Sequence, residues 1–211
     1  MFNSLKEKIE SLTSKFEIIP STRRATLAHL ASYIREKVNL NEPAQLNFIC
    51  THNSRRSHIA QVWAEAAAHF YGIPRVKNYS GGTEATAVNP NVIAALRHTG
   101  FKITVERDLN NPVYSIHISS DHNIKAFSKR YDDSSNPSKD FAAVMVCSDA
   151  DQNCPFVPGA AQRIAITYED PKKADGSPLE TAAYRQTVDE IGREMLYVFS
   201  MINTPKSPSG T

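Results

Sequence analysis

Short apolar runs alternate with helical patterns through most of this 211-residue chain. Four runs have the length and the β-branched, apolar composition of buried strands, and between them apolar residues return every three or four positions. This alternation predicts an α/β fold, a parallel four-stranded sheet with helices on both faces. The predicted strands are 46–49, 76–80, 142–147 and 163–167, and the predicted helices are 57–71, 90–99 and 181–202.

Residues 1–43 lie outside this alternation and form a predicted N-terminal helical extension. Their apolar residues recur at helical spacing in two stretches, which predicts two amphipathic helices. Such helices bury their apolar side for stability, so we interpret the extension as a cover for the core, as a homodimer contact, or as both. The first stripe contains Phe2, Leu5, Ile9 and Leu12, and the second contains Leu27, Leu30, Ile34 and Val38.

The strand and helix pattern of residues 44–203 is interrupted by an insertion at about residues 108–140. Residues 113–118 alternate like a strand, and residues 124–127 can pair back onto them as a hairpin. The hairpin either extends the edge of the sheet or lies near the mouth of a pocket, and the edge extension is the simpler interpretation. The Pro- and Ser-rich residues 204–211 are predicted to be a disordered tail.

Composition and charge exclude several classes of function. With 41% hydrophobic residues the chain can bury a sizeable core, and its formal net charge of +2 gives no basis for binding nucleic acid. No apolar run approaches the roughly 18 residues of a membrane span, and the first residues lack the apolar centre of a signal peptide. We therefore expect a cytoplasmic protein without membrane or nucleic-acid partners.

The chain has three cysteines, Cys50, Cys147 and Cys154. In a reducing compartment these are expected to serve catalysis, metal binding or plain burial rather than a structural disulfide framework. Cys147 and Cys154 are farther apart than the usual zinc-binding pair, and no second ligand pair is evident. We expect neither a bound metal nor a bound cofactor.

Cys50 opens a run of polar residues between the first predicted strand and the first predicted helix. Backbone N–H groups in such a loop curl around a tetrahedral anion, the helix directs its positive end at it, and Arg56 can hold two oxygens at once. The same positive charge favours a nucleophilic thiolate at Cys50, and Ser57 can donate a hydrogen bond to the sulfur. The candidate oxyanion-binding residues are Thr51, His52, Asn53, Ser54, Arg55 and Arg56.

These residues resemble a known family. Cys50-Thr51, Asn53-Ser54 and Arg56-Ser57 stand as in the nucleophile loop of the low-molecular-weight protein tyrosine phosphatase superfamily. Further segments resemble its thioredoxin-coupled arsenate reductases, and the resemblance extends over roughly residues 45–201. These segments are the run Ser-Gly-Gly-Thr-Glu at 80–84 followed by Val-Asn-Pro at 88–90, the Cys-x6-Cys segment at 147–154, and Glu169-Asp170-Pro171.

The resemblance implies a mechanism and a partner. Asp170 is the expected general acid, and Asp-Pro suits a carboxylate projected from an extended loop. Cys147 is expected to attack Cys50 as arsenite leaves, and Cys154 then to attack Cys147, giving a disulfide that thioredoxin reduces. The relay requires movement, which unwinding of the polar segment 148–153 can supply.

Three positions depart from the family pattern. His52 replaces a glycine, Arg55 replaces a small residue or cysteine, and Gln61 replaces a glutamate linked to a potassium site, so bound potassium is not expected. Arsenate and phosphate resemble each other, and an aryl phosphatase acting through a phosphocysteine at Cys50 is the alternative function. A non-catalytic oxyanion-binding module is the third interpretation.

Overall fold

The computed structural model describes residues 1–154 and 156–202; the predicted tail at 204–211 lies outside this range. The helices are α1 (Asn3–Thr13), α2 (Ser21–Asn39), α3 (Arg56–Tyr71), α4 (Pro90–Thr99), α5 (Ser148–Asn153) and α6 (Glu180–Ser200), with short 3-10 turns η1 (Phe16–Ile18) and η2 (Pro171–Ala174). The strands are β1 (Ala44–Cys50), β2 (Val76–Gly82), β3 (Lys102–Arg107), β4 (Val113–His117), β5 (Asn123–Ala126), β6 (Phe141–Met145) and β7 (Ala160–Ala165).

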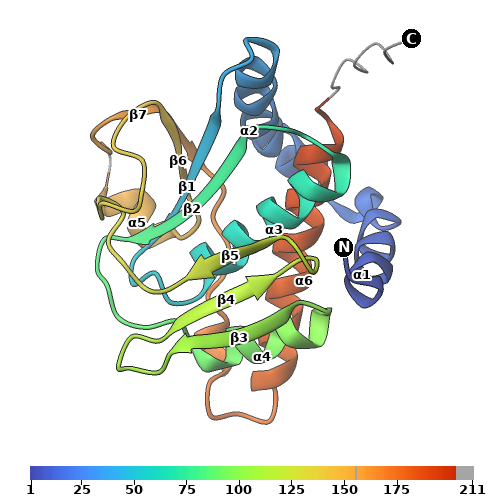
Figure 1. Cartoon of the computed structure of the whole chain (residues 1–211), viewed down its shortest axis with the longest axis vertical. Helices are drawn as coiled ribbons and strands as arrows, with labels where there is room; N and C mark the ends of the chain where they lie inside the picture. The colour runs from blue at the N-terminus through green and yellow to red at the C-terminus, as the bar shows by residue number, and fades with distance from the viewer. Residues whose placement is uncertain (155, 203–211) are drawn as a thin grey trace.

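The main sheet has four parallel strands in the order β2-β1-β6-β7 (Figure 1). Its central strands β1 and β6 are buried at nearly every residue, so both of their faces are covered, as is usual for parallel sheets. The predicted α/β fold is confirmed. Parallel strands bring their carboxyl ends to the same edge, where ligands bind in open α/β sheets. Cys50 ends β1 there, Cys147 follows β6, and Asp170 follows β7.

The N-terminal extension is helical, as predicted. Both α1 and α2 pack against α6, and α2 also contacts β1 and β7. Their apolar stripes are buried, including Leu5 and Ile9 of α1 and Leu27 and Leu30 of α2. The extension therefore covers the core, whereas its role as a homodimer contact stays a prediction.

The insertion forms the predicted hairpin, but the expected extension of the sheet edge is wrong. Strands β4 and β5 pair antiparallel, and β3, which the sequence analysis did not predict, pairs with the other side of β4. The three strands form a separate small sheet with β4 in its centre (Figure 1). Among the described residues, one isolated β-bridge, between Gly82 and Arg130, pairs the backbone after the hairpin with the edge strand β2, and Asn136 Nδ2 also donates to Ser80 O of that strand.

The described helices also bear on a membrane association. Within residues 1–154 and 156–202, none combines the length and the apolar character that crossing a membrane requires.

Candidate active site

The loop between Cys50 and Arg56 connects the end of β1 to the start of α3. Its one residue with a positive φ is Asn53, at 44°, a region that asparagine enters more readily than most residues. His52, which stands where the family has glycine, does not have a positive φ. The histidine therefore fits this loop without backbone strain.

The carbonyl groups of this loop point outward and accept hydrogen bonds from the surrounding chain. The donors come from the end of β2, from the segments before α4 and after β5, and from α3 itself. The bonds are Thr83 N to Cys50 O at 3.1 Å, Glu84 N to Thr51 O at 2.8 Å, Ser128 Oγ to His52 O at 3.0 Å, His58 Nε2 to Asn53 O at 2.9 Å, and Asn89 N to Ser54 O at 2.9 Å.

The backbone N–H groups of the loop lie on its opposite side. In the part of the chain that the structure describes, the backbone N–H groups of residues 51–55 have no protein acceptor. Together with the amino end of α3 they form a concave set of positive partial charges, which suits an oxyanion. Gly82 makes room for this arrangement, because a Cβ there would lie 2.2 Å from Glu84 O and 2.6 Å from Thr51 O.

Cys50 lies at the bottom of the loop beside Ser57. The Cys50 Sγ and Ser57 Oγ are 3.1 Å apart, and Asn53 Nδ2 donates to Ser57 Oγ at 2.8 Å. The Asn53 amide is fixed in this orientation because its Oδ1 accepts from Lys129 N at 2.9 Å. The Ser57 hydroxyl hydrogen is therefore free to point at the Cys50 sulfur, as the sequence analysis predicted.

His58 supports the loop from beneath, a role that the sequence analysis missed. Its ring is fully buried, with Nε2 2.9 Å from Asn53 O and Nδ1 3.3 Å from Ser80 Oγ. Burial, and secondarily the charge of Lys129, lowers the pKa of His58 to about 3. The neutral ring donates from Nε2 to the loop and accepts at Nδ1. No signal in the sequence separates this histidine from a ligand or a catalytic base.

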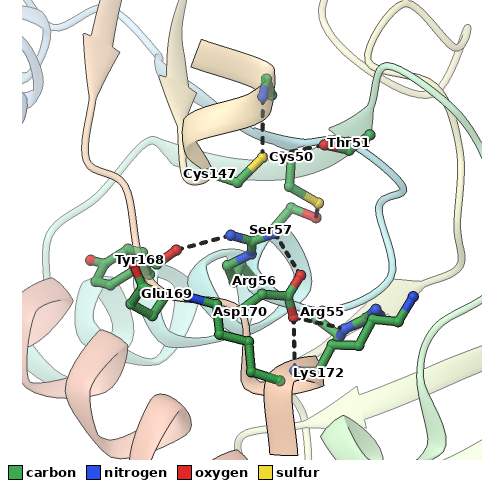
Figure 2. A network of polar contacts seen from close by, with 12 residues as sticks. Cys50, Thr51, Arg55, Arg56, Ser57, Cys147, Tyr168, Glu169, Asp170 and Lys172 are labelled. Atoms are coloured by element: carbon green, nitrogen blue, oxygen red, sulfur yellow. Dashed lines mark hydrogen bonds and ion pairs between the residues drawn. The ribbon is translucent and has the colours of Figure 1, made fainter. Parts of the chain in front are cut away.

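Asp170 closes the pocket by bridging the two arginines of the loop (Figure 2). Its Oδ2 accepts from Arg56 Nη2 at 2.7 Å, and its Oδ1 accepts from Arg55 Nε at 3.0 Å. Arg56 Nη1 donates to the Tyr168 carbonyl at 2.9 Å, and its buried Nε has no partner among the described residues.

The space left under this bridge is small. Cys50, Asp170 and their neighbours enclose a cavity of about 10 Å³, roughly the minimum for one water. This space is smaller than a tetrahedral oxyanion while Asp170 holds its position over the loop. The cavity is lined by Cys50, His52, Ser54, Arg55, Arg56 and Asp170.

The other two cysteines lie at the two ends of α5. Cys147 is fully buried at the amino end, where its Sγ accepts from Ala150 N at 3.4 Å and lies 3.5 Å from Thr51 Oγ1 (Figure 2). Cys154 follows the carboxyl end and is 9% exposed. All three cysteines are free thiols. Among the described residues, no cluster of His, Cys, Asp and Glu is arranged to hold a metal.

In His52 and Thr51, two of the predicted oxyanion-binding residues, the backbone contributes more to the oxyanion-binding loop than the side chain does. His52 is half exposed and lies 3.7 Å from Glu84, and the Thr51 hydroxyl faces Cys147. Ser128 and Lys129 of the insertion, which hold the loop, were not predicted. Their contacts depend on where the inserted hairpin ends, which the sequence pattern did not define.

The fold and the site define a class of enzyme in which a cysteine at the end of the first parallel strand attacks an oxyanion held by backbone amides. The chain belongs to the low molecular weight phosphotyrosine protein phosphatase family, whose model matches residues 45–204.

Curated relatives and a solved structure agree with this assignment. An arsenate reductase of Bacillus subtilis (strain 168) is 33% identical over 149 residues, covering 70% of this chain and 89% of the relative. One of Oceanobacillus iheyensis is 34% identical over 146 residues, covering 69% and 87%. The structure of a low molecular weight phosphotyrosine phosphatase from Vibrio cholerae O395 covers 74% of this chain and 95% of its own, with a TM-score of 0.50 and 12% identity, and is similar in fold.

Proposed function

We propose that this protein is an arsenate reductase that holds arsenate in the loop after β1 and reduces it with Cys50, Cys147 and Cys154. One observation carries the proposal: Cys147 Sγ lies 3.5 Å from the hydroxyl of Thr51, the residue that follows the nucleophile. A reductase needs a second thiol beside the nucleophile loop, because this thiol takes part in thiol–disulfide exchange with the nucleophile. The relatives named arsenate reductase support the same substrate.

The first step is attack of the Cys50 thiolate on arsenic. A sulfur–arsenic bond forms and one arsenic–oxygen bond breaks; the proton that the Cys50 thiol gives up passes to Asp170, which hands it to the leaving oxygen, so that this oxygen departs as water. We expect arsenate to bind the unpartnered Nε and the Nη2 of Arg56, and so to compete with the Asp170 carboxylate that accepts from Nη2. The displaced Asp170 can stay anchored to the nucleophile loop through Arg55 and within its own segment through Lys172 N.

The next steps transfer two electrons to arsenic. The Cys147 thiolate attacks the Cys50 sulfur, a disulfide forms between them, and the electron pair of the sulfur–arsenic bond leaves with arsenite. Cys154 then attacks Cys147 and releases Cys50 as a thiolate. Arsenic gains the two electrons that Cys147 and Cys154 lose. A dithiol protein, thioredoxin in our proposal, reduces the resulting Cys147–Cys154 disulfide.

The last exchange requires α5 to unwind. Seven residue steps separate Cys147 from Cys154, and at a rise of about 1.5 Å per helical residue their Cα atoms are about 10 Å apart. Disulfides span Cα distances of at most about 7 Å. We therefore propose that α5 is helical in the reduced enzyme and opens during turnover.

The test is arsenate-dependent NADPH consumption with thioredoxin and thioredoxin reductase. Cys147→Ser and Cys154→Ser are each expected to abolish turnover, because either change interrupts the relay. Phosphate is expected to protect Cys50 from iodoacetamide in both variants as it does in the wild type, because the loop is intact. Unchanged turnover in both variants would refute the proposal.

Hydrolysis of aryl phosphates is the second candidate. It is favoured by the observation that Cys50, Arg56 and Asp170 are already assembled, whereas Cys147 and Cys154 lie at opposite ends of α5. A phosphatase would form a phosphocysteine at Cys50 and use Asp170 first as acid and then as base. Cys50-dependent hydrolysis that persists in Cys147→Ser, without arsenate turnover, would favour this candidate.

A further inference from the structure

Arg23, in the first turn of α2, links the N-terminal extension to the chain segment that carries the general acid. Its guanidinium donates from Nη2 to the Thr167 carbonyl at 3.1 Å and lies 4.8 Å from the centre of the Tyr168 ring. On its other side it binds Glu194 of α6, with Nε 2.9 Å from Oε1 and Nη2 2.9 Å from Oε2. The arginine therefore joins α2, α6 and the segment after β7.

This segment carries Asp170 and contacts Arg56 of the nucleophile loop. Tyr168 N donates to Val146 O at 3.2 Å, so the peptide unit between Thr167 and Tyr168 is held by Val146 on one side and by Arg23 on the other. A peptide unit is planar, so two such contacts fix its orientation. The next carbonyl, that of Tyr168, accepts from Arg56 Nη1 (Figure 2), and Asp170 follows two residues later.

The contacts of Arg23 are shielded from water. Glu194 is 4% exposed and Tyr168 is 5% exposed, and neither lines the pocket. Their shielding keeps the arginine in one geometry, because a buried carboxylate is strongly disfavoured without its partner. Arg23 does not reach the oxyanion pocket, so it acts on the site through the peptide unit it holds.

We infer that Arg23 is a positioning residue for the Cys50 site. It aligns the Tyr168 carbonyl that orients Arg56, and with it the start of the Asp170 loop. The N-terminal extension is thus part of the catalytic architecture as well as a cover for the core. The inference depends on oxyanion binding at Cys50, and it holds whether the bound oxyanion is then reduced or transferred.

The test compares three variants of the full chain. Arg23→Gln combined with Glu194→Gln removes the link without leaving a buried charge unpaired, and Glu194→Gln alone keeps the bond from Arg23 to Thr167. Lys8→Gln is the matched control, because Lys8 forms a 2.6 Å ion pair with Asp189 that joins the same extension to the same helix α6. Lys8 has no contact with the site.

The readouts are the phosphate concentration that halves the rate of Cys50 alkylation by iodoacetamide, followed by peptide mass spectrometry, and the melting temperature. We expect the double variant to need about 10-fold more phosphate, as a misplaced binding group costs one to two orders of magnitude. Lys8→Gln is expected to stay within about twofold of the wild type, since it leaves every contact of Arg23 in place; Glu194→Gln, which keeps the bond to Thr167 but loses the carboxylate that fixes Arg23, is expected to fall between the control and the double variant.

A purely structural role gives a different result. It would lower the melting temperature and the folded fraction, but phosphate would protect the molecules that remain folded at the wild-type concentration. That result, or equal phosphate requirements in the double variant and Lys8→Gln, would overturn the inference. Phosphate protection is measured without arsenate turnover, so the proposed reductase function can fail while this inference stands, and the reverse.

Discussion

Asp170 has two roles at the residue scale that compete for the same arginine. In the empty site it pairs with Arg55 and Arg56, and in the proposed reaction it protonates the leaving oxygen. Its carboxylate therefore competes with an oxyanion for Nη2 of Arg56. One substitution is expected to change binding and turnover in opposite directions.

The variant Asp170→Ala is expected to bind phosphate more tightly, by about 5-fold or more, because a charge-assisted bond of about 1 kcal/mol no longer competes for Arg56. Its Cys50-dependent turnover is expected to fall about 100-fold or more through loss of the acid. Titration of Cys50 protection by phosphate and steady-state kinetics check the two effects. Weaker phosphate binding in the variant would show that the carboxylate supports the pocket instead.

His58 makes the free energy of unfolding depend on pH. Its pKa is lowered to about 3 by burial in the folded chain, whereas an unfolded histidine has a pKa near 6.5. Between these values the unfolded chain binds a proton that the folded chain does not, so acid favours unfolding. Stability is expected to fall as the pH decreases from about 6.5, by up to about 1.4 kcal/mol per pH unit.

Denaturant unfolding between pH 6.5 and 4 checks this expectation in the wild type and in His58→Gln. The slope of stability against pH is expected to be smaller in His58→Gln, whose side chain does not titrate. His29→Gln is the control, because His29 is exposed on α2 and is solvated in both states. Parallel curves for wild type and His58→Gln would contradict the buried neutral histidine.

At the element scale, α5 connects structure to the proposed redox chemistry. The Asp151 amide donates to Cys147 O and the Cys154 amide donates to Ala150 O, each at 3.0 Å. Oxidation to the Cys147–Cys154 disulfide is expected to break these bonds. Hydrogen exchange over residues 148–154 should therefore accelerate after stoichiometric arsenate. In Cys154→Ser, which cannot form this disulfide, we expect no such acceleration. Equal protection of these amides from exchange before and after oxidation of the wild type would contradict the unwinding of α5.

The elements also show how far sequence reasoning reached. The alternation of strand and helix patterns predicted the four parallel strands and the main helices, because burial on both faces leaves an apolar signature in the sequence. Strand β3 was missed although Lys-Ile-Thr-Val-Glu at 102–106 alternates polar and apolar residues, a pattern typical of a half-buried strand. The insertion could not be placed from sequence, since β4 can pair with several edges.

Part of the site could be predicted, because the positions of its residues follow from their order along the chain and along the sheet. Cys50, Arg56 and Ser57 are close in sequence, and Asp170 and Cys147 follow strands of the same sheet. The supporting donors were not predictable, because Ser128 contacts the loop and Arg23 contacts the segment before Asp170 from elements whose packing only the tertiary structure defines.

The whole molecule places three thiols and one acid at a single end of a parallel sheet. The N-terminal extension and the insertion both contact segments that hold the site, through Arg23 and Ser128 respectively. The catalytic architecture therefore involves the extension and the insertion as well as the α/β core. The central claim for this assembly is that arsenate is reduced by the thiols of the protein itself.

The most direct test is a single turnover without any external reductant. Reduced protein is mixed with an equal amount of arsenate, and arsenite, free thiols and disulfide positions are measured together. We predict about one arsenite and about two lost thiols per chain, with Cys147 joined to Cys154 and Cys50 still free. Cys50→Ser is expected to give no arsenite. If the wild type keeps all three thiols and produces no arsenite, the account of this protein as an arsenate reductase is contradicted.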